Sequence, residues 1–585
     1  MQYNLNKEDT HKKTAFWQVG QKLWLLISEE KKIIIIALIV VIINSLLSLI
    51  APRLIGHTID TYIIGRDYHG VLVFAGIILA LYLLSLITSY LQIRLMGGVG
   101  QRVLYRLRNK IFNKLQSLPV AFFNQNKAGD LISRINNDTD KINQFFSQSL
   151  VQFFASIFMM IGAMIFLLSL NIRLGAATLS PALFLLLITR LLSPWVKRKN
   201  LTSSKSLGGL SSEIQESLNN FKVIIAFNRR DFFKKRFQEV NDNNYSDAIE
   251  AGVANNTLTP IYGLASNIGQ LIVLAYGLAL ISSGHFTIGL LISFLSYANS
   301  FYNPLRQLAA LWANFQTALA SWDRINEILV LENNLPLLEN TPSVDNNAIL
   351  EFKNVNFKYP DGQEVLHNIN LKLSKGKIYA LIGPTGGGKT TTASLMARLY
   401  DPTAGEILLN GKDIRSYGDE ERTKKIGFIL QEPILFTSTV KENILYGNEK
   451  YSSYDNKQLE NIIAKAGLGQ LLKRFDKGLD TKVTASGDAV SLGQKQLIAF
   501  MRAILRQPEI LILDEATANI DTVTEKLLED ILNNLSSDTT KIIIAHRLNT
   551  IEKADEIFFV NSGKLIRAGS MDHAMEMLLH HNRNS

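Results

Sequence analysis

Six long apolar stretches constrain most strongly how this chain can fold, because a run of about 20 apolar residues is stable as a helix across a lipid bilayer. The stretches cover about Ile33–Ala51, Val71–Gln92, Leu150–Leu168, Ala176–Leu192, Tyr262–Ser282 and Ile288–Ala309. Backbone N–H and C=O groups must bond to one another inside a bilayer, and helices meet that requirement within each segment. We therefore predict an all-α, six-helix transmembrane domain over residues 1–325, with both ends on the same side of the membrane.

Basic residues between the stretches predict the orientation of this domain. They gather in "RVLYRLRNKIFNKL", between the second and third stretches, and in "KRKN" and "NRRDFFKKR", between the fourth and fifth. The positive-inside rule places these connections, both termini and the rest of the chain in the cytoplasm. Both connections are helical in pattern. We therefore predict long cytoplasmic helical extensions that turn through short cross-pieces at about residues 122–134 and 218–230.

The segment ahead of the first stretch, about residues 14–28, carries aromatic anchors at Phe16, Trp17 and Trp24. This pattern predicts a helix that lies in the membrane interface, with an ordinary soluble helix as the alternative. The initial "MQYNLNKEDTHKK" has no apolar run followed by a small-residue cleavage site, which argues against a cleaved secretory signal. Aromatic side chains within the apolar stretches, such as Phe153 and Tyr297, are expected to pack between helices rather than to bind an apolar ligand.

Composition narrows the remaining classes of function. The net charge of +10 is spread beside apolar segments and forms no basic stripe with interleaved aromatics, so we expect no nucleic-acid partner. The absence of cysteine excludes disulfides and thiolate metal sites. A chain of 585 residues is too long for one core. Residues 326–348 are predicted to be a linker, and residues 349–585 an α/β domain in which strands, turns and amphipathic helices alternate.

The sequence "GPTGGGKT", from Gly383 to Thr390, follows the strand-like "KIYALI" and precedes the helix-like "TTASLMARLY". This context predicts a P-loop in which backbone N–H groups face the β-phosphate, Lys389 reaches the β and γ oxygens, and Thr390 binds Mg²⁺. The predicted nucleotide-binding residues of the loop are Gly383, Pro384, Thr385, Gly386, Gly387, Gly388, Lys389, Thr390 and Thr391.

Two further motifs end apolar strands. "EILILDEATANID" predicts a buried strand that ends at Asp514, a candidate Mg²⁺ ligand, with Glu515 beside it to orient or deprotonate a water. "KIIIAHR" places His546 at the next strand end, where ligands collect in open α/β sheets. Taken alone, His546 fits a structural role better, whereas beside the other motifs it fits a γ-phosphate contact.

The order of Tyr359, "GPTGGGKT", "ILQEP", "VSLGQKQ", "ILILDEATANID" and "AHR" behind six apolar stretches resembles the half-transporters of ATP-binding-cassette exporters over essentially the whole chain. The resemblance implies ATP and Mg²⁺ as cofactors, and two cassettes that enclose two ATP molecules head to tail. It implies that Tyr359 stacks on adenine, that Gln431 senses Mg²⁺ and the attacking water, and that Glu515 is the catalytic base. It also implies that His546 holds the γ-phosphate and that Asp521 belongs to a loop at the cassette interface. The implied Mg²⁺ residues are Thr390, Gln431 and Asp514.

The signature of that family normally reads L-S-G-G-Q, and this chain has Leu492 in place of the first glycine. The residues expected to face the partner's ATP are Ser491, Leu492, Gly493 and Gln494. A leucine obstructs the close backbone approach and unusual φ that glycine permits. Just upstream, where related exporters usually read Gly-Glu-Arg, the chain has Thr484, Ala485 and Ser486. We therefore expect a heterodimer with one competent and one degenerate ATP site, and a homodimer is the alternative.

The resemblance implies a multi-pass protein of the bacterial plasma membrane that pumps hydrophobic or amphipathic compounds, as multidrug exporters do. A homodimeric lipid or peptide exporter and a cassette-gated membrane protein that does not pump remain as alternatives.

Overall fold

The structure is a computed structural model, and it divides into two compact units. The described residues are 3, 5, 28–332, 335–339, 348–360, 362–484, 490–514, 521–544, 553–569, 572–574 and 576–577. The helical unit comprises the described parts of Glu8–Leu115 and Gly129–Val330, and the cassette unit those of Met1–Lys7, Gln116–Ala128 and Leu331–Ser585. Most of the helix predicted at about residues 14–28 lies outside the described residues.

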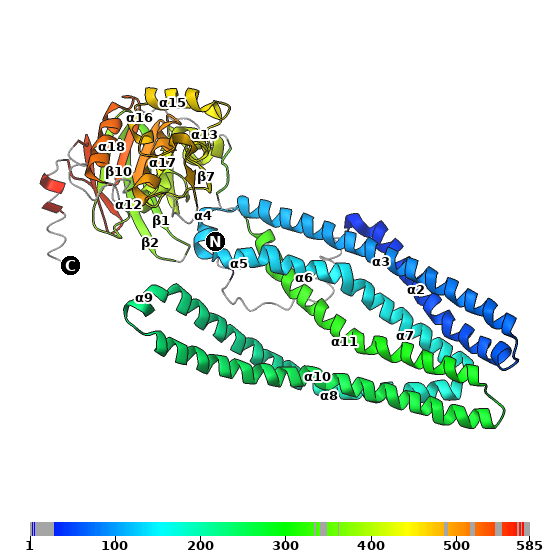
Figure 1. Ribbon diagram of the computed structural model, residues 1–585. Coiled ribbons are helices and arrows are strands. Elements are labelled where there is room, and N and C mark those ends of the chain that lie inside the picture. Colours follow the sequence, from blue (N-terminus) through cyan, green and yellow to red (C-terminus); the bar gives the residue numbers. More distant parts are fainter. Residues whose placement is uncertain are drawn as a thin grey trace. The chain divides into compact units, whose positions relative to one another are not determined.

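Helices, most of them long, make up the helical unit (Figure 1). They are α2 (Lys31–Thr58), α3 (Tyr68–Gln116), α5 (Ala128–Ser133), α6 (Thr139–Gln144), α7 (Leu150–Leu170), α8 (Ile172–Asn219), α9 (Phe221–Ala226), α10 (Arg230–Ser282) and α11 (Ile288–Val330). All six predicted apolar stretches are helical, which confirms the predicted helical membrane domain. Within the described residues, five helical runs are long and apolar enough to cross a membrane: Lys31–Ile63, Tyr68–Gln116, Ala128–Leu170, Ile172–Asn219 and Arg230–Ser282. The sixth stretch lies in α11, and its crossing stays a prediction.

Several helices are far longer than a bilayer requires. The helices α3, α8 and α10 contain 49, 48 and 53 residues. At 1.5 Å per residue each is about 70–80 Å long, against a hydrocarbon core of about 30 Å, so each must continue beyond it. The helices α8 and α10 run side by side and are joined at one end by the short α9, which lies within the predicted cross-piece 218–230 (Figure 1).

The other predicted cross-piece, at residues 122–134, differs from the structure in its bounds. A short helix, α4 (Val120–Gln125), begins after Pro119, whose fixed φ suits a helix start, and ends at the extended Asn126. Residues from Ala128 already belong to the next long helix. This helix continues through π-helical turns at Arg134–Asp138 and Phe145–Ser149 and runs to Leu170.

Hydroxyl groups join the membrane helices to one another. The hydroxyl of Tyr297 on α11 donates to the Leu49 carbonyl on α2 at 2.7 Å, and that of Tyr302 donates to the Thr178 carbonyl on α8 at 2.7 Å. Polar groups in an apolar region need such partners, and backbone carbonyls of neighbouring helices supply them. Tyr297 also stacks on Phe166 of α7 with ring centroids 4.9 Å apart, so it packs between helices as expected.

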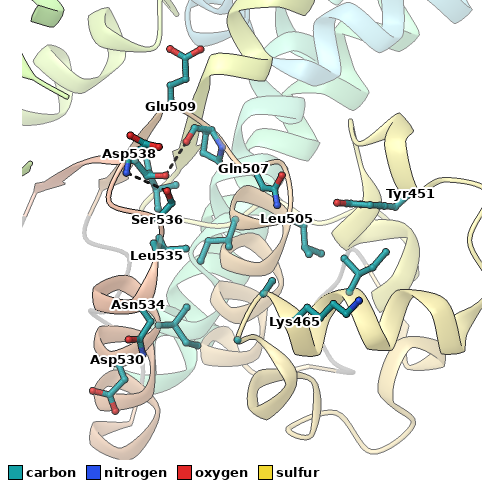
Figure 2. A pocket seen from close by; sticks show the side chains of 18 of the residues that line it. Tyr451, Lys465, Leu505, Gln507, Glu509, Asp530, Asn534, Leu535, Ser536 and Asp538 are labelled. Carbon is teal, nitrogen blue, oxygen red and sulfur yellow. Dashed lines mark hydrogen bonds between the residues drawn. The ribbon is translucent and has the colours of Figure 1, made fainter. Parts of the chain in front are cut away.

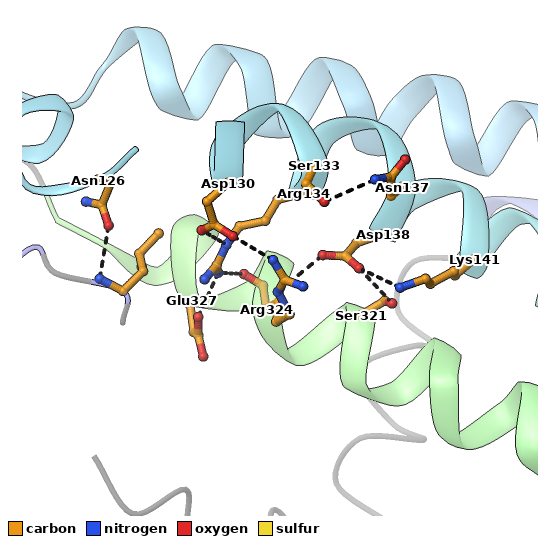
Figure 3. A network of polar contacts seen from close by, with 11 residues as sticks. Asn126, Asp130, Ser133, Arg134, Asn137, Asp138, Lys141, Ser321, Arg324 and Glu327 are labelled. Carbon is orange, nitrogen blue, oxygen red and sulfur yellow. Dashed lines mark hydrogen bonds and ion pairs between the residues drawn. The ribbon is translucent and has the colours of Figure 1, made fainter. Parts of the chain in front are cut away.

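A network of alternating charges joins the N-terminal part of the Ala128–Leu170 helix to the C-terminal end of α11 (Figure 3). Arg134, only 3% exposed, lies 2.9 Å from Asp130 and 2.7 Å from Glu327. Arg324 lies 2.7 Å from Asp130 and 3.4 Å from Asp138, which is 1% exposed. Buried charges are tolerated only when they are paired, and these pairs fix the packing of the two helices.

The cassette unit contains two main sheets. An antiparallel sheet has the order β2-β1-β4-β5, and a second sheet has the order β12-β11-β3-β10-β9-β6 with β12 antiparallel to the rest. The strands are β1 (Ala348–Lys358), β2 (Glu364–Ser374), β3 (Ile378–Ile382), β4 (Ala404–Leu409), β5 (Lys412–Asp413), β6 (Ile426–Ile429), β9 (Ile510–Asp514), β10 (Thr540–Ile544), β11 (Glu556–Asn561) and β12 (Lys564–Arg567), and β7 (Ser438–Thr439) pairs with β8 (Lys482–Val483). This confirms the predicted α/β class.

The described part of the cassette also contains helices between the strands. They are α12 (Lys389–Met396), α13 (Asp419–Lys425), α14 (Val440–Leu445), α15 (Asn456–Lys465), α16 (Gly469–Leu472), α17 (Leu492–Ile504) and α18 (Thr522–Asn534). Every residue of β9 and β10 is buried, as expected for parallel strands covered on both faces. The carboxyl ends of β3, β10, β9 and β6 therefore meet at one edge of the sheet, which we call the catalytic edge.

Candidate functional site

The P-loop leaves β3 at the catalytic edge and leads into α12. Gly383 has φ +144° and a side chain there would clash with the carbonyl oxygen of Val560, so only glycine fits. Gly388 has φ +112° immediately before α12 and would likewise meet Leu366. The glycines thus allow a close loop whose backbone amides lead into a helix N-terminus, an arrangement suited to binding phosphate.

Lys389 and Thr390 occupy the first positions of α12. Lys389 is 6% exposed, and its ammonium donates to the carbonyls of Gly383 at 2.8 Å and Pro384 at 3.0 Å, so the side chain lies within the loop. The Thr390 hydroxyl donates to Oδ1 of Asp514 at 3.4 Å. The structure thus brings together the P-loop and the end of β9, which are 124 residues apart in the sequence.

Thr390 and Asp514 present oxygen donors that suit Mg²⁺. Ligand oxygens on neighbouring positions of an octahedral Mg²⁺ lie about 3 Å apart, close to the separation of these two side chains. Asp514 is 2% exposed at the end of β9. Among the described residues no three His, Cys, Asp or Glu side chains cluster, so phosphate oxygens and water would supply the other ligands.

Gln431 follows β6 at the same edge. Because Ile429 of β6 pairs with Leu513 of β9, Gln431 stands just beyond the level of Asp514, and it is exposed. Glu515 and His546, the predicted base and γ-phosphate contact, lie outside the described residues. Their roles stay predictions.

Tyr359 follows β1, and its hydroxyl lies 3.0 Å from Oγ1 of Thr391 on α12. The Tyr359 ring meets Phe357 and Tyr400 edge to face, with centroid distances of 4.9 and 5.3 Å. The predicted adenine-stacking residue is therefore held beside the P-loop helix. Tyr400 itself was not identified from the sequence.

The signature residues open α17. Ser491 is the N-cap: its hydroxyl accepts from the Gln494 N–H at 3.2 Å, and the Gln494 side chain accepts from the Ser491 N–H at 2.9 Å. Leu492 is the first residue of the helix, so its backbone is helical and needs no glycine, while its side chain is 46% exposed. The leucine therefore departs from the family pattern through its bulk rather than through backbone strain. Gly493 follows it within the helix.

Arg474 contacts the signature, and sequence reasoning missed it. The Gln494 amide donates to the Arg474 carbonyl at 2.9 Å. Hydrogen bonds from Thr524 lower the pKa of Asp521, the N-cap of α18, and the Arg474 charge lowers it further. Asp521 is thus an exposed, anionic cap at the predicted interface loop.

Arg502 and Asn443 hold the segment that follows Gln431. Arg502, on α17, donates to the Asn443 carbonyl at 2.7 Å and to the Ile434 carbonyl at 3.2 Å. Asn443 in turn exchanges two hydrogen bonds with the backbone of Phe436. The sequence offered no local signal for these contacts, which connect the signature helix to the segment after Gln431.

The large cavity in Figure 2, about 910 Å³, is not the nucleotide site. Its lining includes Lys375, Glu509 and Thr539, which lie just before β3, β9 and β10, together with residues of α15 and α18. It therefore lies at the opposite edge of the parallel sheet from the P-loop. The predicted nucleotide-binding residues lie at the catalytic edge instead.

Membrane-length helices and a P-loop ATPase domain in one chain define an ATP-driven membrane transporter. Residues 34–305 match the family model for the ABC transporter transmembrane region, and residues 366–518 match the family model for the ABC transporter. The chain is 32% identical over 557 residues to the uncharacterized ABC transporter ATP-binding protein YfiC of Bacillus subtilis, covering 94% of this chain and 91% of the relative. The chain therefore belongs to the ABC transporter family.

Two other relatives are similar along most of their length. The fatty acid ABC transporter ATP-binding/permease protein of Mycobacterium bovis is 32% identical over 507 residues, 86% of this chain and 80% of its own. The multidrug resistance ABC transporter ATP-binding and permease protein of Lactococcus lactis subsp. cremoris is 30% identical over 528 residues, 90% and 88%. The chain is an ABC exporter of half-transporter type and a multi-pass membrane protein, and its cassette is an ATPase.

Proposed function

We propose that this chain exports hydrophobic or amphipathic compounds from a bacterial cell as one half of a heterodimer. The long helices beyond the membrane and the complete P-loop in one chain support ATP-driven transport. The name of the Lactococcus lactis relative supports multidrug cargo. The observation that carries the heterodimer is Leu492, whose exposed side chain stands at the signature while the capping box of α17 is complete.

In this proposal ATP binds at the catalytic edge. Lys389 turns toward the β and γ oxygens, while Thr390, Gln431 and Asp514 would hold Mg²⁺, which would supply positive charge against the phosphates. Glu515 takes the proton of the attacking water, and the partner's signature completes this site. At the second site, Leu492 and its neighbours face ATP bound to the partner, and turnover is slower.

The basic connections orient the cassette and both termini toward the cytoplasm. ATP draws the two cassettes together, the two predicted cross-pieces relay that displacement to the long helices, and the cargo cavity opens outward. Hydrolysis then resets the dimer.

The test combines dimer formation with transport. The chain is purified alone and with candidate partner half-transporters, and ATPase activity and cargo accumulation in inverted vesicles are measured. We expect a stable, active complex only with a non-identical partner, and we expect Glu515→Gln to abolish most turnover. An active homodimer would overturn the heterodimer, and near wild-type turnover by Glu515→Gln would overturn the assigned base.

Fatty acid is the second cargo class, favoured by the 32% identity to the mycobacterial fatty acid transporter. A panel of labelled fatty acids and cationic aromatic drugs in the same vesicles separates the two. Accumulation of fatty acid alone would replace the multidrug assignment. Failure to concentrate any compound, with ATPase intact, would favour a cassette-gated protein that does not pump.

A further inference from the structure

A chain of four side chains connects α4 to the P-loop helix within the cassette unit. Asn124 of α4 donates to the Tyr400 hydroxyl at 2.8 Å. The rings of Tyr400 and Tyr359 meet at 90° with centroids 5.3 Å apart. The Tyr359 hydroxyl lies 3.0 Å from Oγ1 of Thr391, on α12. One continuous set of contacts thus joins α4 to the residue expected to stack on the nucleotide base.

The α4 end of this connection is firmly packed. Phe122 is completely buried and meets Tyr3 edge to face at 6.3 Å. The Asn126 amide is buried and donates to the carbonyls of Tyr3 and Phe122, each at 2.8 Å. The side chain that Tyr400 contacts therefore belongs to a firmly packed helix rather than to a loose loop. A displacement of Tyr400 can be transmitted to α4 through these contiguous contacts.

A cavity of about 350 Å³ lies beside the two tyrosines. Its walls include Phe357, Tyr359 and Tyr400, and also Pro119 and Ala121 at the start of α4. This volume falls within the range of sites that hold small molecules. A base placed against Tyr359 in this cavity would therefore have α4 as part of its surroundings.

We propose that Tyr400 is a positioning residue through which α4 responds to the nucleotide base, separately from the phosphates. A base stacked on Tyr359 restricts that ring, the edge-to-face contact restricts Tyr400, and the Tyr400 hydroxyl then holds Asn124. The phosphates bind on the P-loop backbone and do not enter this route. The inference rests on the proposed function only in taking Tyr359 as the base-stacking residue.

The test compares ligands with and without a base on the full chain in lipid nanodiscs. Hydrogen exchange is followed in the peptide that contains α4, with MgATP or with magnesium tripolyphosphate, because exchange reports local opening. We expect MgATP to slow α4 exchange about five-fold more than tripolyphosphate, the effect of one neutral hydrogen bond. Equal protection by the two ligands would overturn the proposal.

Variants locate the effect at the Asn124–Tyr400 contact. Tyr400→Phe keeps the ring but removes the hydroxyl, and we expect it to abolish the base-dependent part of the protection, as should Asn124→Ala. The double variant should lose no more than either single one. Asn124→Asp should restore the difference, because its carboxylate accepts a hydrogen bond from the Tyr400 hydroxyl.

Tyr417→Phe is the matched control. It removes a tyrosine hydroxyl that donates to the Leu409 carbonyl at 2.8 Å elsewhere in the cassette unit, and it should retain base-dependent protection. Retention of the difference by Tyr400→Phe, or its loss in Tyr417→Phe, would refute the assigned route. Exchange is measured without cargo, so a failure to pump would refute the proposed function and leave this inference standing.

Discussion

Replacing Leu492 tests how the altered signature acts. Leu492 begins α17 in helical conformation with its side chain 46% exposed, so the backbone imposes no need for glycine. If only the bulk of the Leu492 side chain keeps the N–H groups in the first turn of α17 away from a phosphate, Leu492→Ala and Leu492→Gly should both let the phosphate reach these N–H groups. One recovered hydrogen bond to a charged phosphate contributes about 1.5–3 kcal/mol, which slows nucleotide release roughly 10- to 150-fold.

The two variants differ in their cost to the cassette. Glycine in a helix costs about 1 kcal/mol relative to alanine, so Leu492→Gly should unfold more easily while Leu492→Ala keeps more of the stability of α17. The assay is the release rate of labelled ATP from the purified dimer after rapid dilution. Ile566→Ala, which removes another half-exposed apolar side chain, should leave release unchanged. Slow release in the glycine variant but not in the alanine variant would show that backbone freedom, not bulk, was missing.

Three further outcomes follow from the contacts described. Lys389→Ala should weaken the binding of fluorescent ATP at least ten-fold, because a charged contact with the phosphates is lost. The control Lys353→Ala, which removes one partner of a surface ion pair with Glu406, should leave binding unchanged. Equal binding by the two variants would refute the P-loop role of Lys389. Arg324→Gln leaves the buried Asp138 with a weaker partner and should lower the free energy of unfolding by about 1–3 kcal/mol. Lys234→Gln, at an exposed ion pair, should change that free energy little, and thermal unfolding of both variants measures the difference. Hydrogen bonds from Thr524 lower the pKa of the Asp521 carboxylate. The stability that this carboxylate gives as the cap of α18 is therefore fully present above its unfolded pKa of about 3.9, and it is lost only as the pH falls through the lower pKa of the folded state. A loss of activity near pH 6 that Asp521→Asn removes would contradict this.

The sequence predicted what depends on local pattern. Apolar runs located the membrane helices, and the glycine spacing of the P-loop located the turn where Gly383 and Gly388 adopt positive φ. Both signals are local, because the conformation of an apolar run or of a glycine-rich turn depends mainly on the residues within that segment. The sequence did not predict that the long helix begins at Ala128, because the helical pattern around the first cross-piece is continuous. Only the extended Asn126 interrupts it in the structure.

Contacts between distant segments could not be read from the sequence. Asn124 and Tyr400 are 276 residues apart, and neither stands in a recognisable motif. Arg502 and Asn443 are 59 residues apart, and their pairing depends on how α14 packs on α17. Such residues become visible only when the fold places them together, although they position the segments that carry the motifs.

The connections of α17 bear on whether the signature has decayed. At its N-terminus Ser491 and Gln494 form a complete capping box, and Gln494 also holds Arg474, whose charge acts on Asp521. Further along the helix, Arg502 fixes the segment after Gln431. A site that is no longer used has no need for a capped helix whose side chains hold Arg474 and the segment after Gln431 in place. Leu492 therefore alters one contact surface on a helix whose N-terminal cap and whose contacts with Arg474 and Asn443 are formed, which supports the slower second site that we propose.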